Sequence, residues 1–390
     1  MPATLSSLPA RLPAHQPTRL TAGRSLVTRV VIVGSGPAGL AAYRALLRAA
    51  GRAVRSGDIH LTVISETPDV HAPDLHADVL AGHLPAEYAR TPLRTLLPRA
   101  TVLVSRVVQA DLTMQRLQVS RADHDPCWLG FDHLILGDDR PAAPTAALAD
   151  RLGNHPPVRV TVLGGDVAGA ELALAVREWQ RERDLGGGVT LRCGGELLSA
   201  QPGLSVPVRA ALGAAGVTVH ELARGTGSDG RDDHDLTVVT DAAPHVLPGT
   251  ETLPRTPGGF LLTDAALRVP DPTSVWAART AAHGWHAGQN VARTLCRRGA
   301  QPFPAGPHWA ARSVRLGHWN AVTHLRGPGP GTGLTLGGRL GWLARSLLIA
   351  AQVPRPADRG RVLLSLLRPA PRAEPDAPAK ARTPDRPTPV

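Results

Sequence analysis

The sequence predicts an α/β fold in which a strand, a glycine-rich turn and a helix follow one another twice. One such unit lies near residues 29–50 and the other near residues 158–180. A chain of 390 residues has room for two domains, and a hydrophobic content of 43% can supply a core for each. Because this repeated unit is typical of dinucleotide-binding domains, we expect two Rossmann-like domains in one chain.

The first unit opens with a β-branched run from Arg29 to Val33, which predicts a buried parallel strand. An amphipathic helix follows, and the turn between them reads Gly34-Ser35-Gly36-Pro37-Ala38-Gly39. The first glycine permits the tight turn, the second lets a pyrophosphate approach the backbone, and the third lets the helix pack on the strand. The turn therefore predicts a diphosphate at the helix N-terminus. The alternative is a turn that serves packing alone.

The strand after this helix, from His60 to Ile64, is followed closely by Glu66. In dinucleotide-binding domains an acidic side chain at this place binds the ribose hydroxyls. Glu66 is therefore a candidate for the ribose contact. The equally weighted alternative is a solvated acid in a loop.

The second unit begins with the strand from Val160 to Leu163 and has the turn Gly164-Gly165-Asp166-Val167-Ala168-Gly169. Gly164 and Gly169 keep the outer frame of a dinucleotide turn, whereas Asp166 stands at the middle glycine. A side chain there fills the space of the pyrophosphate, and its carboxylate repels the phosphate charge, so we expect weak dinucleotide binding. The next strand ends in Arg192 and Cys193 instead of an acid, and an arginine there suits a 2′-phosphate.

Residues 29–300 resemble the FAD/NAD(P)-binding pyridine nucleotide-disulfide oxidoreductase family, and within it the type II NADH dehydrogenases. The disulfide-reductase branch does not fit, because the chain has no pair of cysteines with four residues between them. Strands at Thr101–Val104 and Arg116–Val119 resemble the family's meander. The other segments that carry the resemblance are His71–Leu84, which leads in the family to a helix beside the flavin, Ala89–Arg94, Ala170–Ala173, Ser274–Ala278 and a helix beginning near His286.

The resemblance implies an FAD-type domain with an NAD(P)-type domain inserted in it, followed by a helical C-terminal extension. It also implies a hydride transfer from NAD(P)H to FAD and then to a quinone or similar acceptor. It places the FAD diphosphate on Gly34, Ser35, Gly36, Pro37, Ala38 and Gly39. Glu66 would bind the FAD ribose, Thr280 would lie near the ribityl chain, and Gly164 and Gly169 would hold NAD(P)H. No catalytic side chain is assigned, and no metal site is expected.

Several positions depart from the family pattern. The family's Ala-Thr-Gly reads Gly137-Asp138-Asp139, its flavin-binding Gly-Asp falls on Arg279-Thr280, and its glutamine-rich quinone turn falls on Ala282 to Ala287 without a glutamine. Together with Asp166, these changes indicate an impaired site. The alternative function is a catalytically inactive protein of flavoprotein fold, a pseudoenzyme that acts as a binding or membrane-associated partner.

The positive charge of the chain, +11, would usually indicate a nucleic-acid partner or an anionic membrane. However, Lys380 is the only lysine, and glycine and proline are abundant, which is typical of a GC-rich bacterial genome. We therefore expect no nucleic-acid binding. The three cysteines are far apart in the sequence and exclude a disulfide scaffold, and Cys193 is expected to pack as a small hydrophobic residue.

Two apolar segments with arginines, 336–351 and 361–368, predict C-terminal helices. Arginine flanks and Trp342 suit peripheral attachment to a membrane; a homodimer contact and packing on the protein's own surface are the alternatives. We expect a cytoplasmic protein, with peripheral contact at the inner face of the cell membrane as a further option. The predicted parts are a flexible leader 1–28, an FAD-type domain 29–140 and 256–300, an NAD(P)-type domain 141–255, a C-terminal helical region 301–369 and a disordered tail 370–390.

Overall fold

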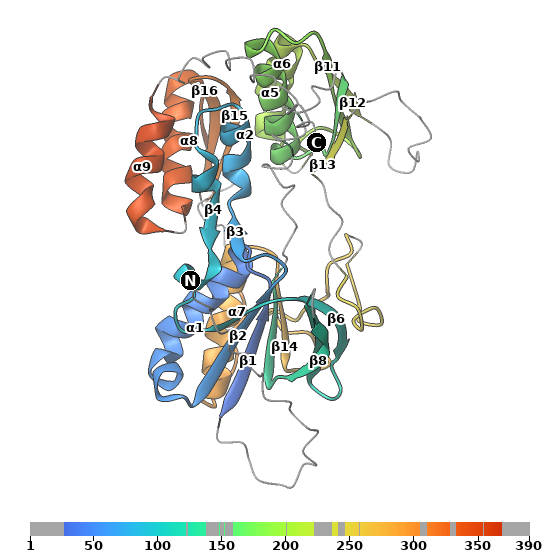
Figure 1. The fold of residues 1–390 in the computed structure, drawn as a ribbon, viewed down its shortest axis with the longest axis vertical. Helices are drawn as coiled ribbons and strands as arrows, with labels where there is room; N and C mark the ends of the chain where they lie inside the picture. The colour runs from blue at the N-terminus through green and yellow to red at the C-terminus, as the bar shows by residue number, and fades with distance from the viewer. Residues whose placement is uncertain are drawn as a thin grey trace, which may run out of the picture.

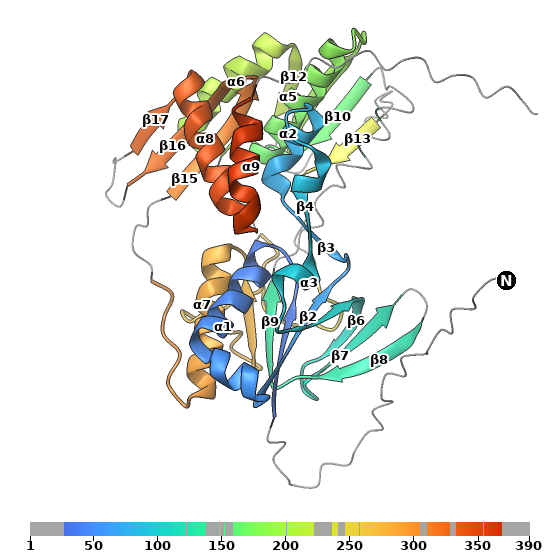
Figure 2. The same ribbon diagram turned by 60° about the vertical axis from the view of Figure 1, so that its left-hand side comes forward.

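The computed structural model describes residues 27–121, 124–137, 148, 152, 159–199, 201–221, 236–240, 246–256, 258–304, 310–327, 333–353 and 355–368. The predicted tail, almost all of the predicted leader and the Asp138-Asp139 pair lie outside these residues. Figures 1 and 2 show two bodies along the long axis of the molecule, one built around β1 and the other around β10.

The first body contains a five-stranded parallel sheet in the order β14-β9-β1-β2-β5. Helices α1 (Pro37–Ser56) and α7 (Ala281–Leu295) lie side by side on one face of this sheet (Figure 2). β14 returns to pair with β9 after more than a hundred residues of intervening chain, which confirms the predicted insertion of one domain in the other. The strands are β1 (Thr28–Val33), β2 (Ile59–Ser65), β5 (Thr101–Val104), β9 (His133–Gly137) and β14 (Val275–Ala278).

A three-stranded antiparallel meander packs beside this sheet and is formed by β6 (Arg106–Asp111), β7 (Arg116–Arg121) and β8 (His124–Gly130). The prediction that Thr101–Val104 belongs to the meander is wrong, because this strand pairs in parallel with β2. The Ser105 amide donates to the Ser65 carbonyl, and the meander starts directly afterwards. A short apolar run has the same sequence pattern in either sheet, so only the pairing separates the two.

The second domain has a four-stranded parallel sheet in the order β12-β11-β10-β13. Its buried core combines these strands with α5 (Val167–Glu182) and α6 (Pro202–Ala215). The repeated unit thus forms the expected second Rossmann-like domain. Its strands are β10 (Arg159–Leu163), β11 (Gly188–Cys193), β12 (Val217–Glu221) and β13 (Leu236–Val239).

The C-terminal unit contains the two predicted helices, α8 (Gly338–Gln352) and α9 (Pro356–Leu366). An antiparallel sheet that the sequence did not predict precedes them, and α8 packs on its central strand β16. This sheet is formed by β15 (Ala310–Gly317), β16 (Asn320–Arg326) and β17 (Gly333–Leu336). Among the described residues, no helix is long and apolar enough to cross a membrane.

A long excursion from the first domain joins the two bodies (Figure 2). The antiparallel pair β3 (Asp69–His71) and β4 (Arg90–Pro92) leads to the 3-10 turns Pro73–Leu75 and Ala86–Ala89, to α2 (His76–Leu80) and back to α3 (Leu93–Leu96). α2 packs on α5 and contributes to the core of the second domain. The apolar residues of α2 are thus buried against the second domain, and the helix beside the flavin stays a prediction.

Candidate functional site

The first glycine turn has the geometry of a dinucleotide turn. Gly34 has φ 110°, a left-handed conformation that favours glycine. A Cβ atom on Gly39 would lie 1.9 Å from the Gly34 carbonyl oxygen, so α1 can pack this closely only with glycine there. Gly36 is the N-cap of α1, with φ −68° and ψ −173°, and Pro37 starts the helix. The hydroxyls of Ser35 and Ser65 lie 2.7 Å apart and tie the turn to the end of β2.

Helix α7 meets this turn through two glycines that the sequence reasoning did not single out. A Cβ on Gly284 would lie 2.0 Å from the Ala38 carbonyl oxygen, and one on Gly288 would lie 2.4 Å from that of Ala42. Glycines four residues apart share one face of a helix, and this spacing was the available sequence signal. Consequently the N-termini of α1 and α7 converge at the same edge of the sheet.

Thr280 lies at this edge as the N-cap of α7, and its hydroxyl accepts a hydrogen bond from the His283 amide at 3.2 Å. Because of this cap, α7 starts at Ala281, several residues before the predicted start near His286. The Arg279 guanidinium stacks on the Phe260 ring, 4.6 Å from its centroid. These two residues thus replace a Gly-Asp pair with a capping hydroxyl and a stacked cation.

Glu66 follows β2 directly, as the sequence predicts, and is half exposed. Its carboxylate accepts two hydrogen bonds from the Arg106 guanidinium, at 3.2 and 3.1 Å. A ribose at this place would have to share or displace a bidentate ion pair. Arg106 lies forty residues further along the chain, which is why the sequence reasoning missed it.

The second glycine turn keeps the first and last glycines of a dinucleotide turn and has Asp166 at the middle glycine. Gly164 has φ 145°, and a Cβ on Gly169 would lie 2.1 Å from the Gly164 carbonyl oxygen. Asp166 is the N-cap of α5, and its Oδ1 accepts a hydrogen bond from the Gly169 amide at 2.9 Å. The carboxylate therefore lies at the helix N-terminus, where a dinucleotide turn holds its anion.

Cys193 ends the next strand and is buried in the core of the second domain. Burial, with Glu221 as a smaller cause, raises the pKa of its thiol to about 11. The thiol is therefore protonated at neutral pH, in agreement with the predicted packing role. Within the described part of the chain, no group of three or more His, Cys, Asp or Glu side chains could hold a metal ion.

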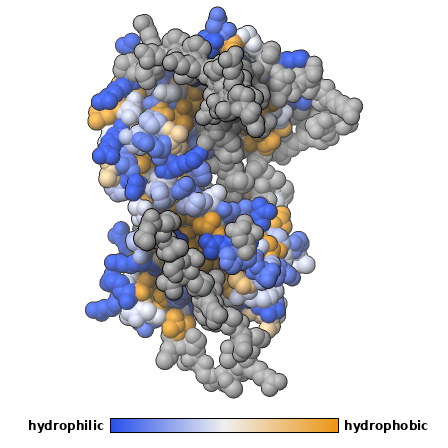
Figure 3. Space-filling model, viewed as in Figure 1, coloured by the Kyte–Doolittle hydropathy of each residue, from blue (hydrophilic) through white to orange (hydrophobic). Residues whose placement is uncertain are grey.

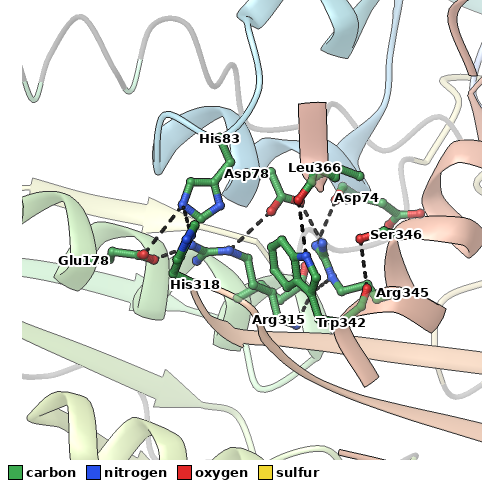
Figure 4. Close-up of polar contacts among 11 residues, drawn as sticks. Asp74, Asp78, His83, Glu178, Arg315, His318, Trp342, Arg345, Ser346 and Leu366 are labelled. Atoms are coloured by element: carbon green, nitrogen blue, oxygen red, sulfur yellow. Dashed lines mark hydrogen bonds and ion pairs between the residues drawn. The ribbon is translucent and has the colours of Figure 1, made fainter. Parts of the chain in front are cut away.

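A buried network of charged side chains joins α2, α5, β15 and α8, as Figure 4 shows. Arg345, on α8, is 1% exposed and binds Asp78 at 2.8 Å and Glu171 at 3.1 Å. Arg315, on β15, donates its backbone amide to Glu171 at 2.6 Å. The Arg315 guanidinium contacts Asp78 at 3.3 Å and forms an ion pair with Glu178. The network thus connects the C-terminal unit to both α2 and the first helix of the second domain.

Burial and charge shape the pKa values in this network. Burial raises the pKa of Glu171, and the Arg345 cation opposes this. The pKa of Arg345 is lowered by burial but raised overall by the carboxylates of Asp78 and Glu171. Burial, followed by Arg315, lowers the pKa of His83 to about 4, so its imidazole is neutral at pH 7. His83 Nε2 and His318 Nδ1 lie 3.3 Å apart at the edge of the network.

The structure corrects the reading of α8 as a helix with an interfacial tryptophan. Trp342 is 1% exposed, and its Nε1 donates to the Leu366 carbonyl on α9 at 3.2 Å. Arg345, one of the arginines within the segment 336–351, is buried as well. A sequence shows that such residues punctuate an apolar helix, but not that buried carboxylates from other domains meet them.

Comparisons with known proteins show the fold. No protein-family model matches the chain, and no curated protein matches it. Among solved structures, NDH2 of Plasmodium falciparum in complex with NADH matches with a TM-score of 0.67 and 13% identity over 87% of this chain and 97% of that one. The sulfide:quinone oxidoreductase of Aquifex aeolicus has a TM-score of 0.60 and 14% identity, with coverage of 87% and 92%.

The water-forming NADH oxidase of Lactobacillus brevis, bound to NADH, has a TM-score of 0.55 and 17% identity, with 77% of this chain and 75% of that chain covered. Identities this low show the fold alone. The fold that the sequence resemblance predicts is thereby confirmed. The chain has the two-domain fold of the FAD/NAD(P)-binding pyridine nucleotide-disulfide oxidoreductases.

Proposed function

We propose that the protein is an FAD-dependent oxidoreductase that holds FAD at its first glycine turn. The observation that carries this proposal is the convergence of the α1 and α7 N-termini at a turn whose N-cap residue, Gly36, has no side chain. Two helix N-termini at one sheet edge present amide groups and positive dipole ends to an anionic ligand. The residues present therefore fit a dinucleotide diphosphate.

The chain's own residues would bind and orient FAD, which supplies the electron-transfer chemistry when bound. The turn from Gly34 to Gly39 would receive the diphosphate, with the Pro37 and Ala38 end of α1 beneath it. Glu66 would contact the ribose, in competition with Arg106. Thr280 would donate its hydroxyl hydrogen at the ribityl chain, while its oxygen keeps accepting the capping bond from the His283 amide.

For the electron donor, the resemblance favours NAD(P)H at the second turn, framed by Gly164 and Gly169. Two of the solved structures with this fold are described as complexes with NADH. Asp166 opposes this donor, because its carboxylate lies at the α5 N-terminus. The proposed oxidoreductase is therefore impaired in its use of NAD(P)H.

For the acceptor, we propose a quinone or a similar small molecule, in keeping with the sulfide:quinone oxidoreductase among the structural neighbours.

Leu340, Leu343 and Leu347 lie on one exposed stripe of α8, at 67%, 42% and 51% exposure. Apolar and hydrophilic residues intermix over α8 and α9 in Figure 3. The exposed arginines of residues 338–368 outnumber the acid Asp358: Arg339, Arg355, Arg359, Arg361 and Arg368.

This surface supports peripheral contact with the inner face of the membrane through residues 336–368, and a homodimer contact is the alternative. Cosedimentation with anionic vesicles should decline when Leu343 and Leu347 are both replaced by serine. Chromatography with light scattering would show whether the same pair of substitutions instead separates a dimer. An unchanged outcome in both assays would contradict a role for this stripe.

A catalytically inactive binding or membrane-associated protein is the second candidate function. Asp166 and the stacked Arg279 favour it, since both depart from the family at cofactor positions. The intact first turn favours retained FAD and thus the first candidate.

The visible absorbance spectrum of the purified protein tests the proposal. Flavin bands at 1:1 stoichiometry support FAD binding, and bleaching on anaerobic addition of NADH would show NADH-driven reduction. Flavin bands that NADH does not bleach, but dithionite does, would leave an FAD protein with another donor. A protein that holds no flavin, even after incubation with FAD, would contradict the proposal and favour the second candidate.

A further inference from the structure

The two glycine turns of this chain can be compared position by position. Gly36 and Asp166 are the N-cap residues of α1 and α5, and their backbones are nearly the same, with φ −68° and ψ −173° against φ −91° and ψ −177°. Any residue can adopt this conformation. Glycine at position 36 is therefore not required by the backbone, and an aspartate at position 166 causes no strain.

The glycines that the packing does require are present in both turns. A Cβ would lie 1.9 Å from a carbonyl oxygen at Gly39 and 2.1 Å from one at Gly169. Gly34 and Gly164 both have left-handed φ angles. The two turns thus share these packing glycines, and their N-cap positions differ, with Gly36 in one and Asp166 in the other.

Asp166 fills that position with an anion of the chain's own. Its Oδ1 accepts from the Gly169 amide, an interaction that stabilises the start of α5 and neutralises the dipole there. A pyrophosphate bound at this turn would need the same space and the same amide. It would also meet a like charge at contact distance.

Helix α5 has a second set of contacts, which a dinucleotide site does not explain. Glu171, half a turn beyond Gly169, accepts from the Arg345 guanidinium and from the Arg315 amide. Glu178, two turns further along, binds the Arg315 guanidinium. The same helix packs on α2 from the first domain. α5 is therefore the element on which the C-terminal unit and the α2 excursion are assembled.

We propose that the second dinucleotide-type domain binds no nicotinamide dinucleotide at its glycine turn, and that it serves as the platform that holds the C-terminal unit. Asp166 is the residue that determines this exclusion. The inference deepens the proposed function by denying NAD(P)H at the second domain, and it rests on that function only for the place of FAD.

Isothermal titration calorimetry of the full-length protein with NADH, NADPH and ADP-ribose tests the inference. ADP-ribose carries the pyrophosphate without the nicotinamide and so isolates the contact at the turn. For the wild type we expect no saturable binding at 1 mM ligand. Asp166→Gly should bind at least about ten-fold more tightly, because a like charge about 4 Å from each phosphate weakens binding by roughly this factor even in water.

Asp166→Asn is the matched variant, because an amide keeps the N-cap and the volume of the side chain while removing the charge. It should bind more tightly than the wild type and less tightly than Asp166→Gly. It also keeps the test valid if the loss of the cap unfolds Asp166→Gly. The reverse substitution, Gly36→Asp, should weaken FAD binding at the first turn by at least about ten-fold in Kd for the same reason.

Wild-type binding of NADH or NADPH at micromolar concentration would overturn the proposal. So would folded Asp166→Gly and Asp166→Asn proteins that bind no better than the wild type, since Asp166 would then not close the turn. The flavin content is a separate readout. A protein that contains FAD and binds no NADH supports both the inference and the proposed function, whereas one that lacks FAD and binds no NADH supports the inference alone.

Discussion

Replacing Arg345 with methionine should destabilise the protein by about 3 kcal/mol, because it removes a buried cation from the carboxylates of Asp78 and Glu171. Arg345 is 1% exposed and lies 2.8 Å from Asp78 and 3.1 Å from Glu171. Methionine restores much of the apolar stem and none of the charge. Breaking a buried pair in this way costs about 3–5 kcal/mol.

The lower end of that range follows from the contacts that remain. Asp78 still lies 3.3 Å from the Arg315 guanidinium, and Glu171 still accepts from the Arg315 amide at 2.6 Å. Each carboxylate therefore keeps one of its partners in the variant. For a cooperative unit of about 150–250 residues, 3 kcal/mol corresponds to a decrease in Tm of about 6–12 °C. Differential scanning calorimetry measures this shift, and urea unfolding followed by circular dichroism gives the free energy.

The control is Arg339→Met, at an exposed position of the same helix, which should change stability by less than about 0.5 kcal/mol. Adding Glu171→Gln to Arg345→Met should recover part of the loss, because a neutral amide needs no counter-charge when buried. A melting temperature of Arg345→Met within 1 °C of the wild type would refute the reasoning. The network would then be too hydrated for its charges to matter.

Two further predictions concern the histidine of the network and the glycines of α7. The pKa of His83 is about 4 in the native protein and about 6.5 in the unfolded chain, so protonation at low pH favours unfolding. As the pH falls from 6.5 to 4, the wild type should therefore lose up to about 3 kcal/mol of unfolding free energy relative to His83→Gln. Urea unfolding at pH 7 and pH 4.5 measures this difference. Gly284→Ala would place a methyl group 2.0 Å from the Ala38 carbonyl oxygen, so it should lower the free energy of unfolding by about 1–3 kcal/mol and lower the FAD content. The control is Gly213→Ala, which has open space at its Cβ. It should leave the FAD content unchanged and either keep the stability or raise it slightly, because alanine favours the helix α6.

Much of the fold can be predicted because its determinants are local. Each glycine turn lies between a β-branched run and an amphipathic helix, so strand, turn and helix are specified within about 25 residues. The C-terminal sheet has no such signal. In β15 the adjacent residues Val314 and Arg315 are both fully buried, so the strand lacks the alternation of a half-buried strand. A charged residue in the middle of a buried strand is intelligible only with its carboxylate partners in place.

The residues of the candidate site also divide into those with local determinants and those that only the fold brings together. The glycines of both turns and the position of Asp166 are visible in the sequence, because a turn is a local structure. The partners of Glu66 and Arg345 are not, since Arg106 and Asp78 are distant in sequence and reach them through the pairing of sheets and the α2 excursion. The Gly284 and Gly288 pair was readable from its spacing, but its meaning depends on α1 as the opposing helix.

The two glycine turns of this chain show which residues a dinucleotide turn needs for packing and which position is left for a ligand. Close approach of helix to strand depends on Gly39 in one turn and Gly169 in the other, and both are present. Ligand approach depends on the N-cap position, where the backbone accepts any residue and only the side chain differs. A Rossmann-like domain can thus keep its fold when a carboxylate of its own chain occupies the anion site at the helix N-terminus. The first turn should therefore respond to Gly36→Asp by losing ligand while keeping its fold, and the second should respond to Asp166→Gly by gaining ligand on an unchanged scaffold.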